Sequence, residues 1–223
     1  MELNPSSPAV QAIPIEECGE PLVDIRQAGG LLYGPPPECE HTEPDYTRLR
    51  LSVYNRLLKA QSLLPDGLKF RLYEGYRSLN VQGWLFDQER QRVQARNPDL
   101  SDEALWLETT RLVSAPFTFD GKPNTPPHST GAAVDLEIID AQGNVIDFGM
   151  EVGDWINVTP ALCRTETEGL SDIARSNREL LVTVMSGVGF VNYPEEWWHF
   201  SYGDQFWACL SDQPNAIYGR IDS

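Results

Sequence analysis

Two short segments, far apart along the chain, each place an imidazole near a carboxylate. The first runs from His128 to Asp135, and the second carries Glu196 and His199 three residues apart within an aromatic run. Two of the chain's three histidines fall in these segments. Two imidazoles and one carboxylate, with a second carboxylate nearby, suit a catalytic zinc ion, which takes three protein ligands and keeps one position open for water. Any fold of this chain therefore has to bring the two segments together.

The first segment needs a sharp turn if His128 and Asp135 are to reach one ion. Seven fully extended residues would span roughly 23 Å, whereas zinc ligands lie about 2 Å from the metal. Residues 129–131 can supply the turn, because Gly131 is free to adopt a positive φ. On a following strand Ala133 and Asp135 share a face, which leaves room for a metal beside the sheet. The alternative is a plain turn into a strand, with a surface histidine hydrogen-bonded to an aspartate.

In the second segment, Glu196 and His199 are an odd number of residues apart. A regular strand would send their side chains to opposite faces and would place His199 beside Trp197. Pro194, just upstream, indicates an irregular start to the strand, from which Glu196 can turn toward the metal. A carboxylate hydrogen-bonded to a metal-activated water is the general base that a hydrolase needs. The alternative is an aromatic core strand that happens to begin with acidic residues.

A further candidate, Arg77, follows the alternating apolar pattern of residues 68–72, which predicts a half-buried strand. Its segment, Glu74-Gly75-Tyr76-Arg77, comes at the end of that strand, where functional side chains often emerge. A guanidinium there can stabilise the negative charge that develops on a carbonyl oxygen during amide hydrolysis. The alternative is a salt bridge to one of the many acidic residues.

In three motifs the sequence resembles the D-alanyl-D-alanine dipeptidase family of zinc peptidases: Glu74-Gly75-Tyr76-Arg77, His128-x-x-Gly131-x-Ala133-x-Asp135 and Glu196-Trp197-Trp198-His199. The resemblance covers residues 48–208 and extends to the wider group of lysostaphin-like, D,D-carboxypeptidase and hedgehog-type zinc folds. It implies one zinc ion per chain, bound by His128, Asp135 and His199. It also implies that Glu196 is the catalytic base and that Arg77 stabilises the transition state.

The same resemblance implies that Asp154 binds the free amino group of the substrate. Two departures from the family pattern concern the substrate pocket. Pro126 stands where the family commonly has a serine that binds the substrate carboxylate, and the family's N-terminal Tyr and Asn-Phe pattern is not recognisable before Asp45. We therefore expect an intact metal centre and an altered substrate pocket.

The activity that the resemblance implies is hydrolysis of D-alanyl-D-alanine, or of a similar small D-amino-acid dipeptide, by a zinc-dependent dipeptidase. One alternative is a D,D-carboxypeptidase that trims peptidoglycan stem peptides, for which an exported protein would be expected. The other is a zinc-bearing binding module without turnover. Glu196 and Arg77 argue against that last alternative, since a purely structural zinc needs neither.

The apolar periodicity predicts an α+β fold with a single domain, in which a small central antiparallel sheet is flanked by helices and carries the zinc site. Residues 1–44, with clustered prolines, are expected to form an irregular arm with one short strand near 22–25, and residues 45–223 the peptidase domain. The predicted elements are helices over 45–64, 79–96, 101–113 and 171–185, strands over 68–72, 133–139 and 190–202, a hairpin turn at 140–144 leading into residues 145–148, and an irregular tail.

Charge and composition narrow the partners. With 17 basic and 33 acidic residues the net charge is −16, which disfavours nucleic acid and anionic membrane surfaces as partners. The partner that the resemblance implies is a small peptide substrate. There is no apolar run of about 18 residues, so no transmembrane helix is expected. Residues 1–5 lack the basic and apolar regions of a secretory signal. The cytoplasm is the expected location, where the four widely spaced cysteines would stay reduced.

Overall fold

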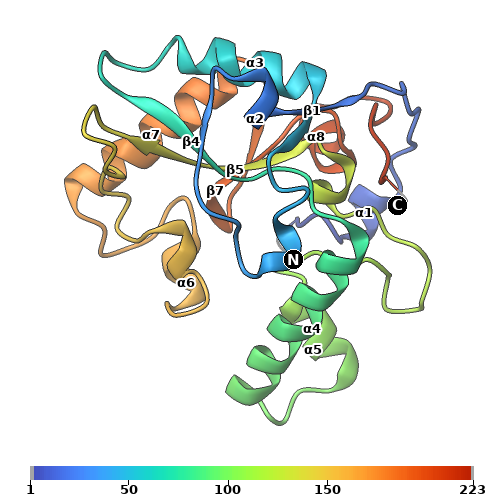
Figure 1. Cartoon of the computed structure of the whole chain (residues 1–223). Helices are drawn as coiled ribbons and strands as arrows, with labels where there is room; N and C mark the ends of the chain where they lie inside the picture. The colour runs from blue at the N-terminus through green and yellow to red at the C-terminus, as the bar shows by residue number, and fades with distance from the viewer. Residues whose placement is uncertain (1–2, 222–223) are drawn as a thin grey trace.

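A five-stranded sheet runs through the centre of the protein, with helices on both sides (Figure 1). The computed structural model describes residues 3–221. The strands are β1 (Leu22–Asp24), β2 (Leu32–Tyr33), β3 (Arg48–Arg50), β4 (Lys69–Glu74), β5 (Ala133–Ile139), β6 (Val191–Tyr193) and β7 (Glu196–Ser201). The helices are α1 (Pro8–Gln11), α2 (Ile25–Ala28), α3 (Leu51–Gln61), α4 (Leu79–Arg96), α5 (Asp102–Thr109), α6 (Pro160–Cys163), α7 (Asp172–Ser186) and α8 (Gln205–Leu210), with 3-10 turns η1 (Glu40–Thr42), η2 (Pro127–Thr130) and η3 (Val152–Asp154). The predicted α+β class, with a small sheet flanked by helices, is confirmed.

The strand order of the main sheet is β2-β4-β5-β7-β6, and a separate two-stranded sheet pairs β1 with β3. The pairs β4–β5, β5–β7 and β6–β7 are antiparallel, as expected, whereas the short edge strand β2 lies parallel to β4. In the centre of the sheet, Asp135 of β5 lies directly opposite His199 of β7. Strand pairing thus brings together the two segments that the sequence singled out.

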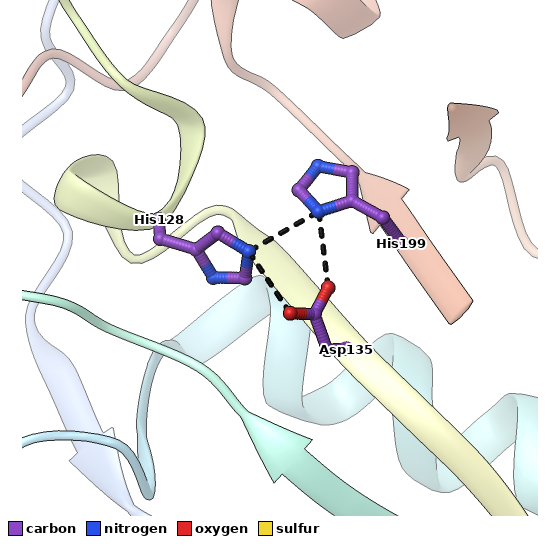
Figure 2. Close-up of side chains that lie close together, drawn as sticks. All are labelled: His128, Asp135 and His199. Carbon is purple, nitrogen blue, oxygen red and sulfur yellow. Dashed lines mark hydrogen bonds and ion pairs between the residues drawn. The ribbon is translucent and has the colours of Figure 1, made fainter. Parts of the chain in front are cut away.

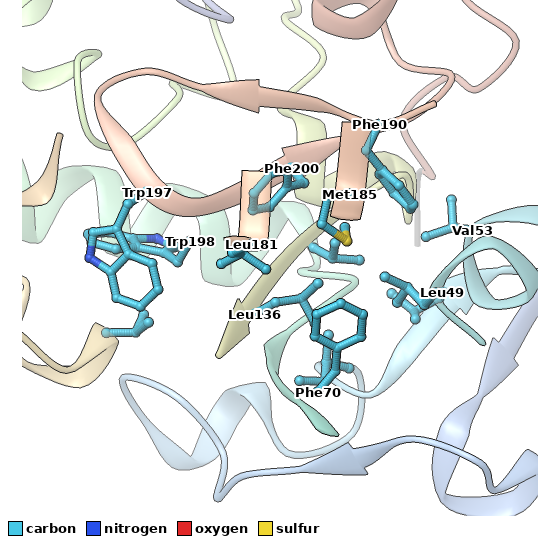
Figure 3. Close-up of a cluster of buried hydrophobic side chains, with 14 of the residues drawn as sticks. Leu49, Val53, Phe70, Leu136, Leu181, Met185, Phe190, Trp197, Trp198 and Phe200 are labelled. Atoms are coloured by element: carbon cyan, nitrogen blue, oxygen red, sulfur yellow. The ribbon is translucent and has the colours of Figure 1, made fainter. Parts of the chain in front are cut away.

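The sheet separates an apolar layer from a polar face. Val134, Leu136 and Ile138 of β5 are fully buried in a core cluster to which α3 and α7 contribute (Figure 3). Because side chains alternate along a strand, Asp135 and Glu137 point to the opposite face. Each such core side chain contributes about 1.5–3 kcal/mol by leaving water, so the apolar layer fixes the register that positions the polar face.

Helix α3 begins at Leu51, six residues later than the predicted start at Asp45. Residues 48–50 instead form β3 and pair with β1, which satisfies their backbone groups outside the helix. Leu49 is nevertheless completely buried, together with Val53 and Leu57 of α3. The spacing of these three residues mimics a helical repeat, and the pairing with the N-terminal arm decides the structure at Leu49.

The predicted long strand over residues 190–202 is a hairpin. Strands β6 and β7 are joined by Pro194 and Glu195, and the proline breaks the run as its missing N–H requires. The predicted helix over 101–113 ends earlier, at Thr109. Residues 145–148, expected after a hairpin turn, contribute only an isolated bridge between Ile139 and Val145. The tail, expected to be irregular, contains α8. Helix α8 is capped by Asp204, whose carboxylate accepts from the backbone N–H of Trp207 at 2.8 Å.

The N-terminal arm carries more regular structure than the single strand predicted there. It forms α1, β1, α2, β2 and η1. Strand β1 lies at the predicted position, except that Ile25 already belongs to α2. The buried guanidinium of Arg50 ties the arm to the body, since it donates to the carbonyl of Glu20 at 2.6 Å and to that of Thr130 at 2.7 Å. The four cysteines are free thiols. Among the described residues, no helix has the length and apolar character needed to cross a membrane.

Candidate active site

Three side chains from three separate elements converge on the polar face of the sheet. Figure 2 shows His128 from η2, Asp135 from β5 and His199 from β7 pointing toward one another. The Nε2 atom of His128 lies 3.1 Å from Nδ1 of His199 and 3.4 Å from an oxygen of Asp135. Nδ1 of His199 lies 3.0 Å from the other oxygen of Asp135. The sequence singled out these three residues as metal ligands, and the fold brings all of them together.

The geometry of this cluster fits a zinc ion. Two ligands about 2.0–2.1 Å from a tetrahedral ion are about 3.3 Å apart, close to the separations found here. The ring of His128 carries its proton on Nδ1, which donates to the carbonyl of Gly75 at 2.8 Å, so Nε2 offers a lone pair to the cluster. Nδ1 of His199 also faces the cluster, and its buried Nε2 has no hydrogen-bond partner among the described residues. Two imidazole nitrogens and a carboxylate therefore surround one point, where a bound cation would balance the negative charge of the carboxylate.

The surroundings of His199 and Asp135 favour the protonation states that metal binding needs. Burial lowers the pKa of His199, which keeps the imidazole neutral, and Asp135 opposes this only in part. Burial alone would raise the pKa of Asp135, but the adjacent His128 and His199 outweigh it and hold that pKa below its ordinary value. Neutral imidazoles and an ionised carboxylate are the forms that bind metal.

Two glycines allow the chain to approach this cluster closely. At Gly75, a Cβ atom would lie 2.5 Å from the side chain of Leu49 and 2.7 Å from the carbonyl of Arg48, so a larger residue would push away the strand end that orients His128. Gly131 has a φ of +71°, as the sharp turn in the first segment predicts. A side chain at Gly131 would also meet Leu22 at 2.4 Å. Both positions are open only to glycine.

An irregular segment of β7 turns Glu196 toward the His128–Asp135–His199 cluster. Asn192 pairs with Phe200, but the next residue, Tyr193, pairs with Glu196, so residues 197–199 form a bulge. Inside it, the side-chain amide of Asn192 donates to the carbonyls of Glu196 at 3.1 Å and His199 at 3.0 Å. The predicted irregular start to the strand is present. Nothing in the sequence pattern indicates that Asn192 holds it.

We expect Asn192→Ala to lower both thermal stability and turnover. The change removes two hydrogen bonds and leaves two partly buried carbonyls without their donor, which costs about 1–3 kcal/mol. Since those carbonyls belong to Glu196 and His199, zinc affinity and kcat should fall as well. Thr165→Val is the matched control, because the Thr165 hydroxyl only donates to the oxygen of the Asn192 amide, at 2.6 Å. Unchanged zinc affinity and kcat in Asn192→Ala would show that the amide has only a stabilising role.

Glu196 lies beside the cluster rather than within it. Its nearest carboxylate oxygen is 3.8 Å from Nδ1 of His199, farther than either oxygen of Asp135 lies from its histidine partner. Burial raises the pKa of Glu196 well above the ordinary value, and the charge of Asp135 adds to this. A buried carboxyl group next to the ligands, with a raised pKa, is placed to exchange a proton with a reacting water.

Arg77 forms a salt bridge and also lines the same cavity. The structural and the catalytic roles considered for it are therefore compatible. Its guanidinium forms a bidentate pair with the fully buried Glu74, with Nε 2.9 Å from a carboxylate oxygen, and donates to Gln82 at 3.0 Å. Burial alone would lower the pKa of Arg77, but the charge of Glu74 outweighs it and raises that pKa, so the group stays cationic. The guanidinium has five N–H donors, and those not bound to Glu74 or Gln82 remain for a substrate.

A small cavity of about 50 Å³ lies over the cluster. This is room for roughly three to five water molecules. Its walls include Glu38 from the arm, Arg111 after α5, Trp155 after η3 and Tyr193 of β6, as well as His128, Asp135, His199, Glu196 and Arg77. The cavity suits a compact ligand, and the N-terminal arm forms part of it.

The residue that the resemblance suggested for substrate binding, Asp154, lies outside this cavity. Asp154, at the end of η3, is exposed and does not line the cavity, although Val152 and Trp155 from the same turn do. Pro126 is buried just before η2, and the neighbouring Pro127 forms part of the wall. Among the wall residues, Glu38 and Gln82 carry no signal in the sequence that points to the site. Glu74 stood in a recognised motif without an assigned role.

Comparison with known proteins places this arrangement in a family. A family model described as D-ala-D-ala dipeptidase matches residues 47–216, most of the chain. The chain belongs to the D-Ala-D-Ala dipeptidase family. It is therefore a metallopeptidase, as the motifs predict.

Two relatives of the family show how far the likeness extends. A D-alanyl-D-alanine dipeptidase of Synechocystis sp. is 32% identical over 95% of this chain and 96% of its own length. A D-alanyl-D-alanine dipeptidase of Escherichia coli is 37% identical over 33% of this chain and 36% of its own length. Among solved structures, the vancomycin-resistance D,D-pentapeptidase VanY in complex with Zn(II) aligns with a TM-score of 0.45 at 16% identity, covering 76% of this chain and 80% of that one.

For this member of the D-Ala-D-Ala dipeptidase family, we expect His199→Ala to lose bound zinc. Two protein ligands would remain, and the buried Asp135 would lose one of its two imidazole partners. Metal analysis of the purified variant, next to the wild type at one zinc per chain, measures the effect. His41→Ala is the matched control, because His41 lies on the exposed arm. Undiminished zinc in His199→Ala would remove this residue from the ligand set.

Proposed function

We propose that the protein is a zinc-dependent dipeptidase that hydrolyses D-alanyl-D-alanine or a similar small D-amino-acid dipeptide. The observation that carries the proposal is the position of Glu196 and Arg77 around the His128–Asp135–His199 cluster, in one small cavity. A metal site that served only structure would need neither a buried carboxyl group beside its ligands nor a fixed guanidinium facing them. The family and the Synechocystis relative support the choice of substrate.

Each residue has a distinct part in the proposed reaction. His128, Asp135 and His199 hold the zinc ion, which when bound lowers the pKa of a water to about 7 and polarises the scissile carbonyl. Glu196 accepts the proton of the attacking water and delivers it to the nitrogen of the leaving amino acid. Arg77 donates to the oxygen that becomes negatively charged as the carbonyl carbon turns tetrahedral. Glu74 and Gln82 keep the guanidinium in place for this step.

A D,D-carboxypeptidase acting on stem peptides is the second candidate. The cavity argues against it, because a stem peptide must extend beyond the D-Ala-D-Ala terminus, and the arm residue Glu38 forms part of the cavity wall. We propose that the protein is a dipeptidase that acts in the cytoplasm.

A substrate panel tests the proposal. Wild-type protein loaded with zinc would be assayed with D-Ala-D-Ala, L-Ala-L-Ala, a mixed D,L-dipeptide and a stem pentapeptide that ends in D-Ala-D-Ala. We expect kcat/KM for D-Ala-D-Ala in the range of roughly 10⁴–10⁸ M⁻¹s⁻¹ that is usual for enzymes, and much lower values for the others. Removal of the metal with a chelator should abolish hydrolysis, and zinc should restore it. Preference for the pentapeptide would favour the carboxypeptidase.

A further inference from the structure

Glu38 occupies a strained turn whose side chain contributes to the active-site cavity. It has a φ of +61°, a left-handed conformation that is uncommon for a residue other than glycine, asparagine or aspartate. The N–H of Cys39 donates to the carbonyl of Pro37 at 2.6 Å, which closes a three-residue γ-turn around Glu38. A γ-turn with positive φ is rare and strained. Strain of this kind persists only where the surroundings enforce it, and it concentrates at functional sites.

The turn is held from one side by its own segment. The hydroxyl of Thr42 donates to the carbonyls of Pro37 at 2.8 Å and Cys39 at 2.7 Å, the two residues that flank Glu38. These bonds keep the backbone of the turn in place without using the Glu38 side chain. The carboxylate is thereby free to enter the cavity.

Inside the cavity, the carboxylate of Glu38 has neutral partners only. The indole N–H of Trp155 donates to it at 2.7 Å, and the hydroxyl of Tyr73 lies 3.4 Å from the same oxygen. Within residues 3–221, no ion pair of Glu38 is found. The charges of Arg77 and Arg92 reach Glu38 only at longer range, since these two guanidinium groups form ion pairs with Glu74 and Glu89. Burial raises the pKa of Glu38, and the hydrogen bond from Trp155 offsets only part of this increase.

A carboxylate that has no ion-pair partner within residues 3–221 and is flanked by two aromatic side chains, in a cavity that also holds the reacting groups, is complementary to a small organic cation. From this arrangement we infer that Glu38 binds the α-ammonium group of the substrate and so restricts the enzyme to peptides with a free N-terminus next to the scissile bond. The inference rests on the proposed dipeptidase function. It gives Glu38 the role that the family pattern suggested for Asp154, and it explains why the N-terminal arm reaches the cavity.

Two variants and two substrates form a cycle that tests this assignment. The variants are Glu38→Gln, which keeps the shape and the acceptor for Trp155, and Glu38→Gly, which removes the side chain while suiting the positive φ. The substrates are D-Ala-D-Ala and N-acetyl-D-Ala-D-Ala, in which the ammonium is replaced by a neutral amide. Zinc content and melting temperature are measured for each protein, and Glu40→Gln, on the exposed start of η1, is the matched control.

Because an ammonium bound equally in the ground state and the transition state affects binding alone, the loss should appear in KM and spare kcat. We expect both Glu38 variants to raise KM for D-Ala-D-Ala by about 10- to 100-fold, the effect of losing a hydrogen bond between charged groups. The wild-type preference for the free over the acetylated dipeptide should shrink by the same factor. Glu38→Gly should melt at or above the wild-type temperature, since glycine relieves the strain.

The outcomes that overturn the inference are separate from those that overturn the proposed function. If the wild type hydrolyses D-Ala-D-Ala while both Glu38 variants keep the wild-type KM and the wild-type preference for the free dipeptide, Glu38 is not the ammonium site and the dipeptidase function stands. If Asp154→Asn shows the effect instead, the ammonium binds there. A wild type that cleaves only N-acylated peptides overturns the dipeptidase function, and the ammonium site with it.

Discussion

Glu196→Gln should retain its zinc and lose about 10²–10⁴-fold in kcat, the usual contribution of a positioned acid or base. The amide keeps the size of the carboxyl group but cannot accept the proton of the attacking water or pass it to the leaving nitrogen. Since Glu196 lies outside the three-ligand cluster, zinc content and melting temperature should remain close to those of the wild type. Single-turnover kinetics with D-Ala-D-Ala, together with metal analysis, measures the effect.

The neighbouring Glu195 provides the control for Glu196, but only if stability is measured too. Its buried carboxylate pairs with Arg111 at 2.7 Å and with Arg164 at 3.0 Å. Glu195→Gln should therefore lower the melting temperature while kcat stays within a few-fold of wild type, because the residue holds the hairpin and exchanges no proton with substrate. Should Glu195→Gln lose turnover while Glu196→Gln keeps it, the base has been assigned to the wrong glutamate.

Arg77→Ala should lower kcat by about 10²–10³-fold, as the loss of one donor to a developing oxyanion typically does, and should change KM far less. The variant also leaves the fully buried Glu74 without its cation, so it is expected to melt at a lower temperature. Kinetics and melting curves are therefore measured together.

A pair of further variants separates the catalytic effect of Arg77 from its effect on stability. In Arg77→Lys a compact ammonium keeps a charge near Glu74 but cannot reproduce the planar fork, so stability should recover more than kcat. Glu74→Gln breaks the same ion pair but keeps the guanidinium itself, with an amide oxygen as its acceptor. Wild-type kcat in Arg77→Ala, with a lowered melting temperature, would assign the residue to the salt bridge alone and would weaken the proposed mechanism.

The convergence of His128, Asp135 and His199 could be predicted from the sequence because the elements that carry them are marked by local sequence signals. His128 and Asp135 are joined by a turn that Gly131 makes possible, and His199 lies on the strand that pairs with that of Asp135. The core strand β5 was predicted with its observed bounds, since its apolar residues alternate clearly. The sequence signals that identify these elements, namely apolar periodicity and turn-forming residues, lie within a few residues of the side chains that they position.

The missed features depend on contacts between distant segments. Leu49 repeats with Val53 like a helical residue, yet β3 forms at this point because the arm supplies a pairing strand. Asn192 orients Glu196 and His199 through the hairpin, which was expected as one strand. Glu38 reaches the cavity through a γ-turn in a proline-rich segment without periodicity. Asp154 is the opposite case. Family resemblance suggested it for substrate binding, but in the fold it is exposed and lies outside the cavity.

The direct pairing of Asp135 with His199 across β5 and β7 has a practical consequence for work with this protein. A slip of one residue between these strands would turn one ligand to the other face of the sheet and destroy the centre. A chain can therefore complete the site only after its two halves have joined in the native alignment. The fraction of purified molecules that carry tightly bound metal becomes a count of correctly assembled chains, and it can be read before any substrate is added.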